Sequence, residues 1–178
     1  MRIGLVLCVL ALGGVAAALS AAEKKPLEVV PRVDLQRYLG TWYEIATIPQ
    51  SFQKGCVGVT AEYTLRPDGD ITVVNTCRQG TLDGKVRRAK AKAWVVDKTT
   101  NAKLKVRFFW PFTGDYWIIG LDADYQWAIV GHPGRNYLWI LSRAPQMNDG
   151  LYNELLRLVA DKGYDLGRIK RTLQPGGN

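Results

Sequence analysis

Residues 57–77 of the chain read VGVTAEYTLRPDGDITVVNTC, and this stretch decides the fold. Over 57–65 apolar and polar side chains alternate, which is the period of a strand with one buried face. A turn follows in which Pro67 presets φ and Gly69 accepts a positive φ. We therefore expect an antiparallel hairpin in which residues 71–77 return along the first strand.

The same hairpin brings two cysteines together. Pairing across the turn places Leu65 near Asp70, so the numbers of partner residues sum to about 135. Cys56 and Cys77 fall within one β-bulge of that register. We expect them to form a cross-strand disulfide, and we favour this over a free nucleophile or a metal site.

Composition bounds the class of protein. The 178 residues are 47% hydrophobic and 22% charged, which predicts a folded domain and excludes a disordered tail or a collagen-like repeat. Net charge is +8, but the basic residues are scattered along strand faces without a dense basic helix. We expect no nucleic-acid partner. Three cysteines and one histidine offer little for a metal site, and we expect no metal and no cofactor.

The chain opens with the pattern of an export signal. Arg2 precedes an apolar run over 3–19 that ends in small residues. We expect residues 1–20 to be a signal peptide, cleaved after Ser20 or Ala22. A retained anchor helix is the alternative, because the run approaches the span of a thin bilayer.

Residues 21–178 are expected to form a single domain. Cys8 comes directly after Leu7 and lies too early in the sequence to accept a lipid, so no lipobox is recognised. We expect an exported protein in an oxidising compartment. A periplasmic, a secreted and an outer-membrane-peripheral location all stay open.

Strand periodicity continues beyond the hairpin. Polar, charged and tryptophan side chains interleave with Ala89, Ala91, Ala93, Val95, Leu104, Val106 and Phe108. These segments predict amphipathic strands with one charged face in water. Residues 115–121, 126–131 and 137–142 are apolar on both faces, so another element must cover their outer side.

A late helix fits this cover. We expect it to begin at Asn148 or Asp149 and to end at Gly163. Its apolar stripe consists of Leu151, Leu155, Leu158 and Val159. Together with a helical turn over 34–39, the pattern predicts an all-β fold. This is an eight-stranded antiparallel up-and-down β-barrel with the late helix packed outside.

A barrel of this size encloses either packed side chains or one small ligand. Small residues on adjoining strands favour a ligand cavity, and aromatic residues on the same face offer flat apolar walls. We expect the cavity to be lined by Ala61, Tyr63, Val73, Asn75, Ala91, Ala93, Val106, Phe108, Tyr137 and Trp139. The alternative, that the aromatic rings fill the space left by the alanines, stays open.

Three residues carry specific expectations. An inward amide at Asn75 needs water, a ligand head group or a tyrosine hydroxyl as partner, since an unsatisfied one costs about 1–3 kcal/mol. Trp42 opens the first strand and Arg143 ends the last. If the barrel closes, the Arg143 guanidinium stacks on the Trp42 indole for about 0.5–2 kcal/mol and plugs one end.

Three motifs in order resemble the signature regions of the lipocalins. They are Gly40-Thr41-Trp42-Tyr43-Glu44, Asp124-Tyr125-Gln126-Trp127-Ala128 and Leu141-Ser142-Arg143. The segments 108–112 (FFWPF) and 137–143 (YLWILSR) resemble the bacterial lipocalin and apolipoprotein D branch. The match runs from about Asp34 to Pro175, nearly the whole mature chain.

The resemblance implies a calyx that binds one hydrophobic molecule, a fatty acid or a lysophospholipid, with a role in cell-envelope maintenance. It implies that Asn75 and Trp139 meet the ligand and that Trp42 and Arg143 close the base. Two features depart from the pattern. Many bacterial members carry a lipid anchor, and the pair Cys56–Cys77 is not general to the fold.

The sequence is compatible with three functions. The leading hypothesis is a non-catalytic lipid carrier, in which affinity grows with each buried methylene. A lipid-modifying enzyme is disfavoured, because a disulfide consumes both mature thiols and no nucleophile is evident near His132. The third is an interaction module with a filled barrel, in which Trp110-Pro111-Phe112 touches a membrane or a second copy as a homodimer.

Overall fold

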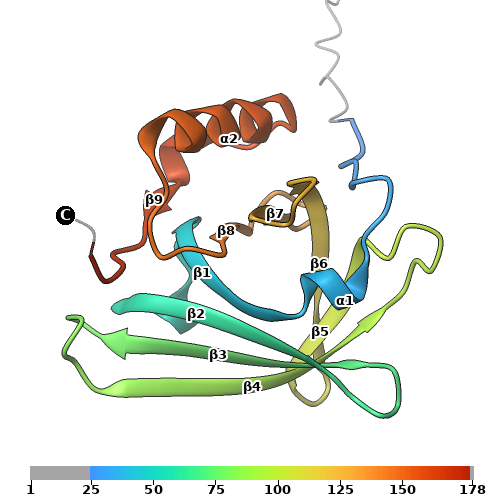
Figure 1. Ribbon diagram of the computed structural model, residues 1–178, viewed down its shortest axis with the longest axis horizontal. Coiled ribbons are helices and arrows are strands. Elements are labelled where there is room, and N and C mark those ends of the chain that lie inside the picture. Colours follow the sequence, from blue (N-terminus) through green and yellow to red (C-terminus); the bar gives the residue numbers. More distant parts are fainter. Residues whose placement is uncertain (1–24, 177–178) are drawn as a thin grey trace, which may run out of the picture.

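The structure is a computed structural model that describes residues 25–176, so the expected signal peptide and its cleavage site lie outside the described residues. It contains an antiparallel sheet ordered β2-β3-β4-β5-β6-β7-β8-β1-β9, and pairing of β1 with β2 closes it into the expected eight-stranded barrel (Figure 1). The strands are β1 (Gly40–Thr47), β2 (Cys56–Leu65), β3 (Ile71–Gln79), β4 (Val86–Val95), β5 (Lys103–Phe109), β6 (Phe112–Leu121), β7 (Trp127–Gly131), β8 (Leu138–Ser142) and β9 (Lys170–Arg171). The helices are α1 (Leu35–Tyr38) and α2 (Asp149–Asp161), with 3-10 turns η1 (Ser51–Gln53) and η2 (Leu166–Arg168).

The hairpin that decides the fold is β2–β3. Leu65 pairs with Ile71, one position from the register expected, and a bulge between Val57 and Thr60 shifts the pairing again. Cys56 therefore lies opposite Gln79 and diagonal to Cys77. The two cysteines still form the predicted disulfide, with their Cα atoms 5.4 Å apart.

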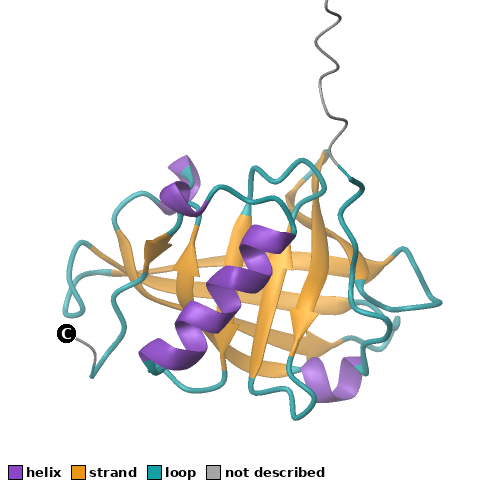
Figure 2. Cartoon of the chain, turned by 90° about the horizontal axis from the view of Figure 1, so that it is seen from above, coloured by secondary structure: helices purple, strands orange, loops and turns teal. Residues whose placement is uncertain are grey.

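Helix α2 covers the outer side of the barrel where the strands are apolar on both faces (Figure 2). Its N-cap is Asn148, whose side chain accepts from the Leu151 amide. The buried face of α2 consists of Tyr152, Leu155 and Val159, which pack in one cluster with Ile119, Ile129, Leu138 and Ile140. Leu158, expected in this stripe, is exposed, because the buried face of the helix runs along Tyr152, Leu155 and Val159 and Leu158 lies to one side of that line. Trp117 and Trp127 also pack against this outer cluster.

The antiparallel order gives the barrel two different ends. The end at which β1 begins, named the closed end, carries α1 and the connections 66–70, 96–102 and 122–126. The end at which β1 finishes, named the open end, carries the connections 48–55, 80–85, 110–111 and 132–137. Asp34 caps α1 by accepting from two backbone amides, and α1 packs against the barrel interior at the closed end.

Candidate functional site

A tryptophan and an arginine seal the closed end. The Arg143 guanidinium lies over the Trp42 indole, with its central carbon 3.8 Å from the ring centroid. Arg143 also donates to the backbone oxygens of Arg37 at 2.7 Å and Thr41 at 2.9 Å. Trp42 is fully buried, and its indole nitrogen donates to the Tyr38 carbonyl at 2.8 Å. Both side chains are thus fixed by stacking and hydrogen bonds together.

Three tyrosine hydroxyls form the next layer inside the barrel. Tyr116 bonds to Tyr38 and to Tyr63, each at an oxygen–oxygen distance of 2.8 Å. Burial raises the pKa of Tyr63 to about 12 and holds the pKa values of Tyr38 and Tyr116 well above the usual range. The hydroxyls are therefore neutral and serve as hydrogen-bonding groups. Their rings fill the half of the interior nearest the closed end.

Inward side chains become more exposed towards the open end. On β4, Ala93 and Ala91 are buried while Ala89, next on the same face, is exposed. On β5, Leu104 is buried and Phe108 is 40% exposed. Because Ala89 pairs with Asn75 on the inward face, its exposure means that solvent reaches the interior from the open end.

The ten residues expected to line a cavity divide between the two halves of the interior. Tyr63, Val73, Ala91 and Ala93 are buried in the core cluster near the closed end. Ala61, Asn75, Val106 and Trp139 are half-buried, with Asn75 paired to Ala61 on one side and to Ala89 on the other. Tyr137 is stacked on Trp139 with ring centroids 6.1 Å apart. Small side chains therefore flank Asn75, away from the tyrosine layer.

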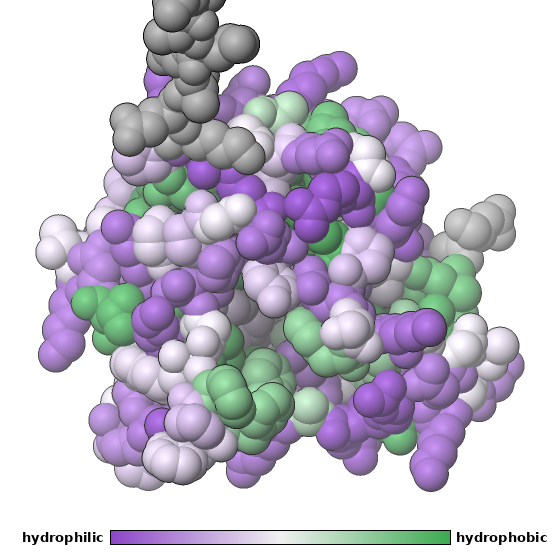
Figure 3. Space-filling model, turned by 180° about the vertical axis from the view of Figure 1, so that it is seen from behind, coloured by the Kyte–Doolittle hydropathy of each residue, from purple (hydrophilic) through white to green (hydrophobic). Residues whose placement is uncertain are grey.

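Exposed aromatic residues gather at the rim of the open end. In the β5–β6 hairpin, Phe109, Trp110 and Phe112 are 67%, 81% and 67% exposed. Phe52 in the 48–55 connection is also exposed. On the face seen in Figure 3 most of the surface is hydrophilic or of intermediate hydropathy, and the hydrophobic residues gather in separate patches.

The C-terminal segment completes the wall where β1 and β2 separate. Their pairing ends at Tyr43 and Thr60, and within the described residues β1 and β2 are not paired further towards the open end. Gln174 bridges the gap, since its buried amide nitrogen donates to the carbonyl of Glu44 at 2.9 Å and to that of Val59 at 2.8 Å. A stretch more than a hundred residues away in sequence thus forms part of the barrel wall.

Glu44 is a buried acid on the inward face of β1. Its carboxylate accepts from the Gln53 amide at 2.9 Å and from the Thr172 hydroxyl. Burial raises the pKa of Glu44, and these two hydrogen bonds oppose that shift. Trp139 donates to the Gln53 side-chain oxygen at 3.4 Å, which connects the acid to the cavity-lining aromatic residues.

A pocket of about 560 Å³ lies against Glu44. The 48–55 connection forms one side and the C-terminal segment forms the other, with Lys54 and Lys170 in the lining. The sequence pattern does not predict this pocket, because Glu44 and its hydrogen-bond partner Thr172 lie far apart in the chain.

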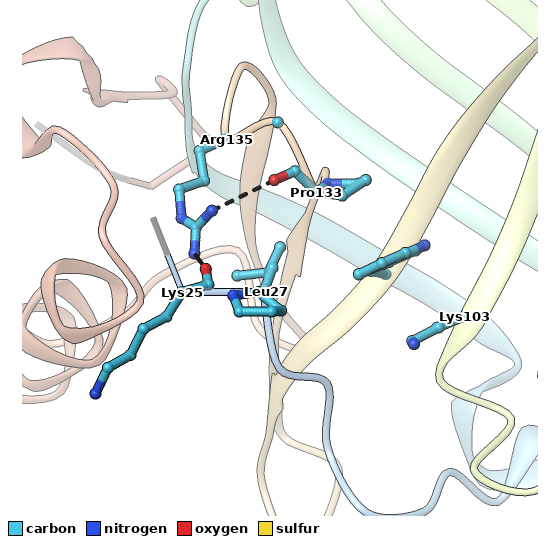
Figure 4. Close-up of a pocket in the computed structure, with 8 residues that line it drawn as sticks. Lys25, Leu27, Lys103, Pro133 and Arg135 are labelled. Carbon is cyan, nitrogen blue, oxygen red and sulfur yellow. Dashed lines mark hydrogen bonds between the residues drawn. The ribbon is translucent and has the colours of Figure 1, made fainter. Parts of the chain in front are cut away.

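A second pocket, of about 410 Å³, lies outside the barrel (Figure 4). Lys103 sits over the Trp117 ring there, 4.6 Å from its centroid. Arg135 is held in place by the carbonyls of Lys162 and Lys25, at 2.6 and 2.7 Å. None of the residues expected to line a cavity belongs to this pocket.

An eight-stranded barrel sealed at one end and open at the other defines a calyx-type binding protein. Residues 33–174 match the family model of the lipocalin-like domain, and the chain belongs to this lipocalin family. The resemblance expected from the three motifs is confirmed. The family consists in the main of proteins that bind and transport small hydrophobic molecules, not of enzymes.

Similar sequences and a similar solved structure support the lipocalin assignment. The chain is 42% identical over 164 residues to temperature-induced lipocalin-1 of Arabidopsis thaliana, covering 85% of each. It is 41% identical over 162 residues to the outer membrane lipoprotein Blc of Escherichia coli K12, covering 91% of each. Bovine (Bos taurus) apolipoprotein D is 31% identical over 149 residues, covering 79% of this chain and 77% of that protein. Insecticyanin from the tobacco hornworm Manduca sexta shares the fold, with a TM-score of 0.65 at 18% identity over 82% of this chain and 83% of that one.

Proposed function

We propose that the chain binds and transports or stores a fatty acid or lysophospholipid, without catalysis, in the half of the barrel interior nearest the open end. The observation that carries this is the exposure of the inward residue Ala89 there, while Trp42 and Arg143 seal the opposite end. Each methylene that leaves water in such a site contributes about 0.8 kcal/mol. The ten residues named from the sequence form the proposed lining: Tyr63, Val73, Ala91 and Ala93 at its floor, and Ala61, Asn75, Val106, Phe108, Tyr137 and Trp139 towards the mouth. Asn75 is the polar group near the mouth.

The proposal includes a place and a role. We infer an exported domain over residues 21–178, periplasmic, secreted or peripheral to an outer membrane, which acts in cell-envelope maintenance. Support comes from the similarity to a protein named outer membrane lipoprotein and from a disulfide that suits an oxidising compartment. None of the helices that the structure describes has the length and apolar character to span a bilayer.

Catalysis is not part of the proposal. Cys56 and Cys77 are joined, so neither offers a thiolate as nucleophile. His132 accepts from the Gly134 amide through Nδ1 at 3.0 Å and lies edge-on to Tyr137. A free-thiol count on the denatured, unreduced protein tests the point, since two free thiols would revive a nucleophile.

The test of binding is displacement of an apolar fluorescent probe by fatty acids of increasing chain length. We expect affinity to rise with length until the interior is full. Ala61→Phe, which places a ring beside Asn75, should weaken binding of long chains. Glu62→Phe, on the outward face of the same strand, should not. Failure of every lipid to displace the probe would reject the proposal.

A second candidate function is contact with a membrane surface or a second copy of the chain through the exposed β5–β6 tip. The 81% exposure of Trp110 favours this contact, because covering a large apolar side chain lowers the free energy of the system. Co-sedimentation with liposomes should fall for Trp110→Ser if the tip meets a bilayer. Sedimentation equilibrium separates the homodimer, which would dissociate in the same variant.

A further inference from the structure

Among the described residues, Glu44 is a buried carboxylate without a cationic partner. Its side chain is 4% exposed, and no lysine, arginine or histidine of residues 25–176 forms an ion pair with it. A charge taken out of water is costly unless an opposite charge or several hydrogen bonds compensate it. Gln53 and Thr172 supply only two neutral hydrogen bonds, and the pKa of Glu44 stays raised.

The neighbouring pocket contains both a negative charge and positive charges, which complement the ammonium and phosphate groups of a zwitterionic ligand. Glu44 is at its inner side, and three basic residues, Lys54, Lys170 and Arg171, complete the charged lining. Arg171 is already engaged, since it bonds Asp149 at 2.6 Å and lies 3.9 Å over the Tyr152 ring. Lys54 and Lys170 form no ion pair within the described part of the chain. One buried negative charge therefore faces a pocket with two available positive charges.

The pocket also adjoins the proposed lipid cavity. Glu44 and Trp42 are on the same inward face of β1, and Thr47 on that face pairs with Trp139. The hydrogen bond from Trp139 to Gln53 joins the cavity wall to the group that holds the Glu44 carboxylate. A molecule with its acyl chain in the barrel could thus place its polar head in this pocket.

We propose that this pocket is a headgroup site for an ammonium-bearing lipid, in which the ammonium lies against Glu44 and the phosphate against Lys54 and Lys170. The inference rests on the proposed function, because it assumes an acyl chain in the barrel. A ligand ammonium supplies the cation that Glu44 lacks, and the lysines complement the phosphate as point charges. The site therefore selects among lipids of equal chain length by their headgroups.

Probe displacement by four ligands tests this proposal: lysophosphatidylcholine, lysophosphatidic acid and a free fatty acid of one chain length, and choline chloride alone. We expect the wild type to bind lysophosphatidylcholine more tightly than lysophosphatidic acid. Glu44→Gln should lower the affinity for lysophosphatidylcholine by about tenfold or more, while the affinity for the fatty acid is unchanged. The matched control is Glu62→Gln, which removes the same charge from an outward position on the neighbouring strand. Choline alone should displace neither probe nor lipid, because it lacks the acyl chain that holds its ammonium in place.

Each outcome decides between the proposals. If Glu44→Gln lowers the affinity for all three lipids equally, or leaves the headgroup preference unchanged, the headgroup site is overturned. The proposal that the wild type binds lipid is then unaffected. If none of the three lipids binds the wild type, the proposed function falls instead. Should Glu44→Gln not fold by circular dichroism, Lys54→Ala with Lys170→Ala asks the same question. That double variant should bind both phosphate-containing lipids more weakly relative to the fatty acid. An unchanged order of affinities overturns the headgroup site.

Discussion

The two ends of the barrel treat the same residue type in opposite ways. At the closed end Trp42 is fully buried, hydrogen-bonded through its indole nitrogen and covered by Arg143. At the open end Trp110 is 81% exposed. Tyrosines follow the same division, since Tyr116 bonds two buried hydroxyls while Tyr137 stacks at the rim. Aromatic composition therefore does not reveal function by itself. The closed end uses its rings for stability, and the open end leaves its rings available for a partner.

The largest expected effect is a direct comparison of the two tryptophans. Trp42→Ala should lower the free energy of unfolding by about 3–5 kcal/mol, because it leaves a large cavity and uncovers Arg143. Trp110→Ala should change it by about 0.5 kcal/mol or less, since that side chain is mostly in water. Denaturant unfolding of both variants provides the measurement. Comparable losses in the two would show that the open end is as tightly packed as the closed one.

The disulfide is the one covalent constraint in the described part of the open end. Replacing Cys56 and Cys77 with serine removes a crosslink between residues 21 apart and should destabilise the protein by about 2–4 kcal/mol. The loss measures how much of the open end's order depends on that bond. Thermal unfolding under oxidising and reducing conditions checks it, because reductant should lower the melting temperature of the wild type but not of the double variant.

The tyrosine layer gives a smaller effect. Tyr116→Phe removes the hydroxyl that bonds both Tyr38 and Tyr63, leaving buried groups without their partner at a cost of about 1–3 kcal/mol. Tyr137→Phe at the rim is the matched control and should be near neutral, since the ring stack on Trp139 is kept. A Tyr116→Phe protein as stable as the wild type would mean that water replaces the missing hydroxyl.

Period-two alternation predicted most of the barrel. It placed β2, β3 and β4 correctly, because neighbouring side chains on these strands face opposite environments, and it brought Cys56 to Cys77. Bulges limited it. The ones after Val57, Glu44 and Ile118 shift pairing in ways that depend on tertiary contacts rather than on local pattern.

The candidate site was predictable only where one strand contains the signal. Asn75 could be assigned to the inner face from its neighbours on β3 alone. Alternation also puts Glu44 on the face of Trp42, but its burial depends on Thr172 and Gln174 in the C-terminal segment. No sequence periodicity links residues so far apart. The same reason explains Tyr116, which acquires its role only when Tyr38 and Tyr63 meet it inside the closed barrel.

The smallest expected effect concerns the acid at the open end. Burial raises the pKa of Glu44 in the folded protein, so the folded state binds its proton more tightly than the unfolded state does. Below the ordinary glutamate pKa of about 4.3 both states are protonated, and wild type and Glu44→Gln should be nearly equally stable. As the pH rises through the folded pKa, the wild type must hold a buried charge and loses stability relative to the variant. Melting temperatures of both proteins from about pH 4 to pH 8, with Glu62→Gln as the outward-facing control for net charge, should show a gap that widens with pH. A gap that narrows instead would mean that a cation already neutralises Glu44, and a lipid ammonium retained through purification would produce that result.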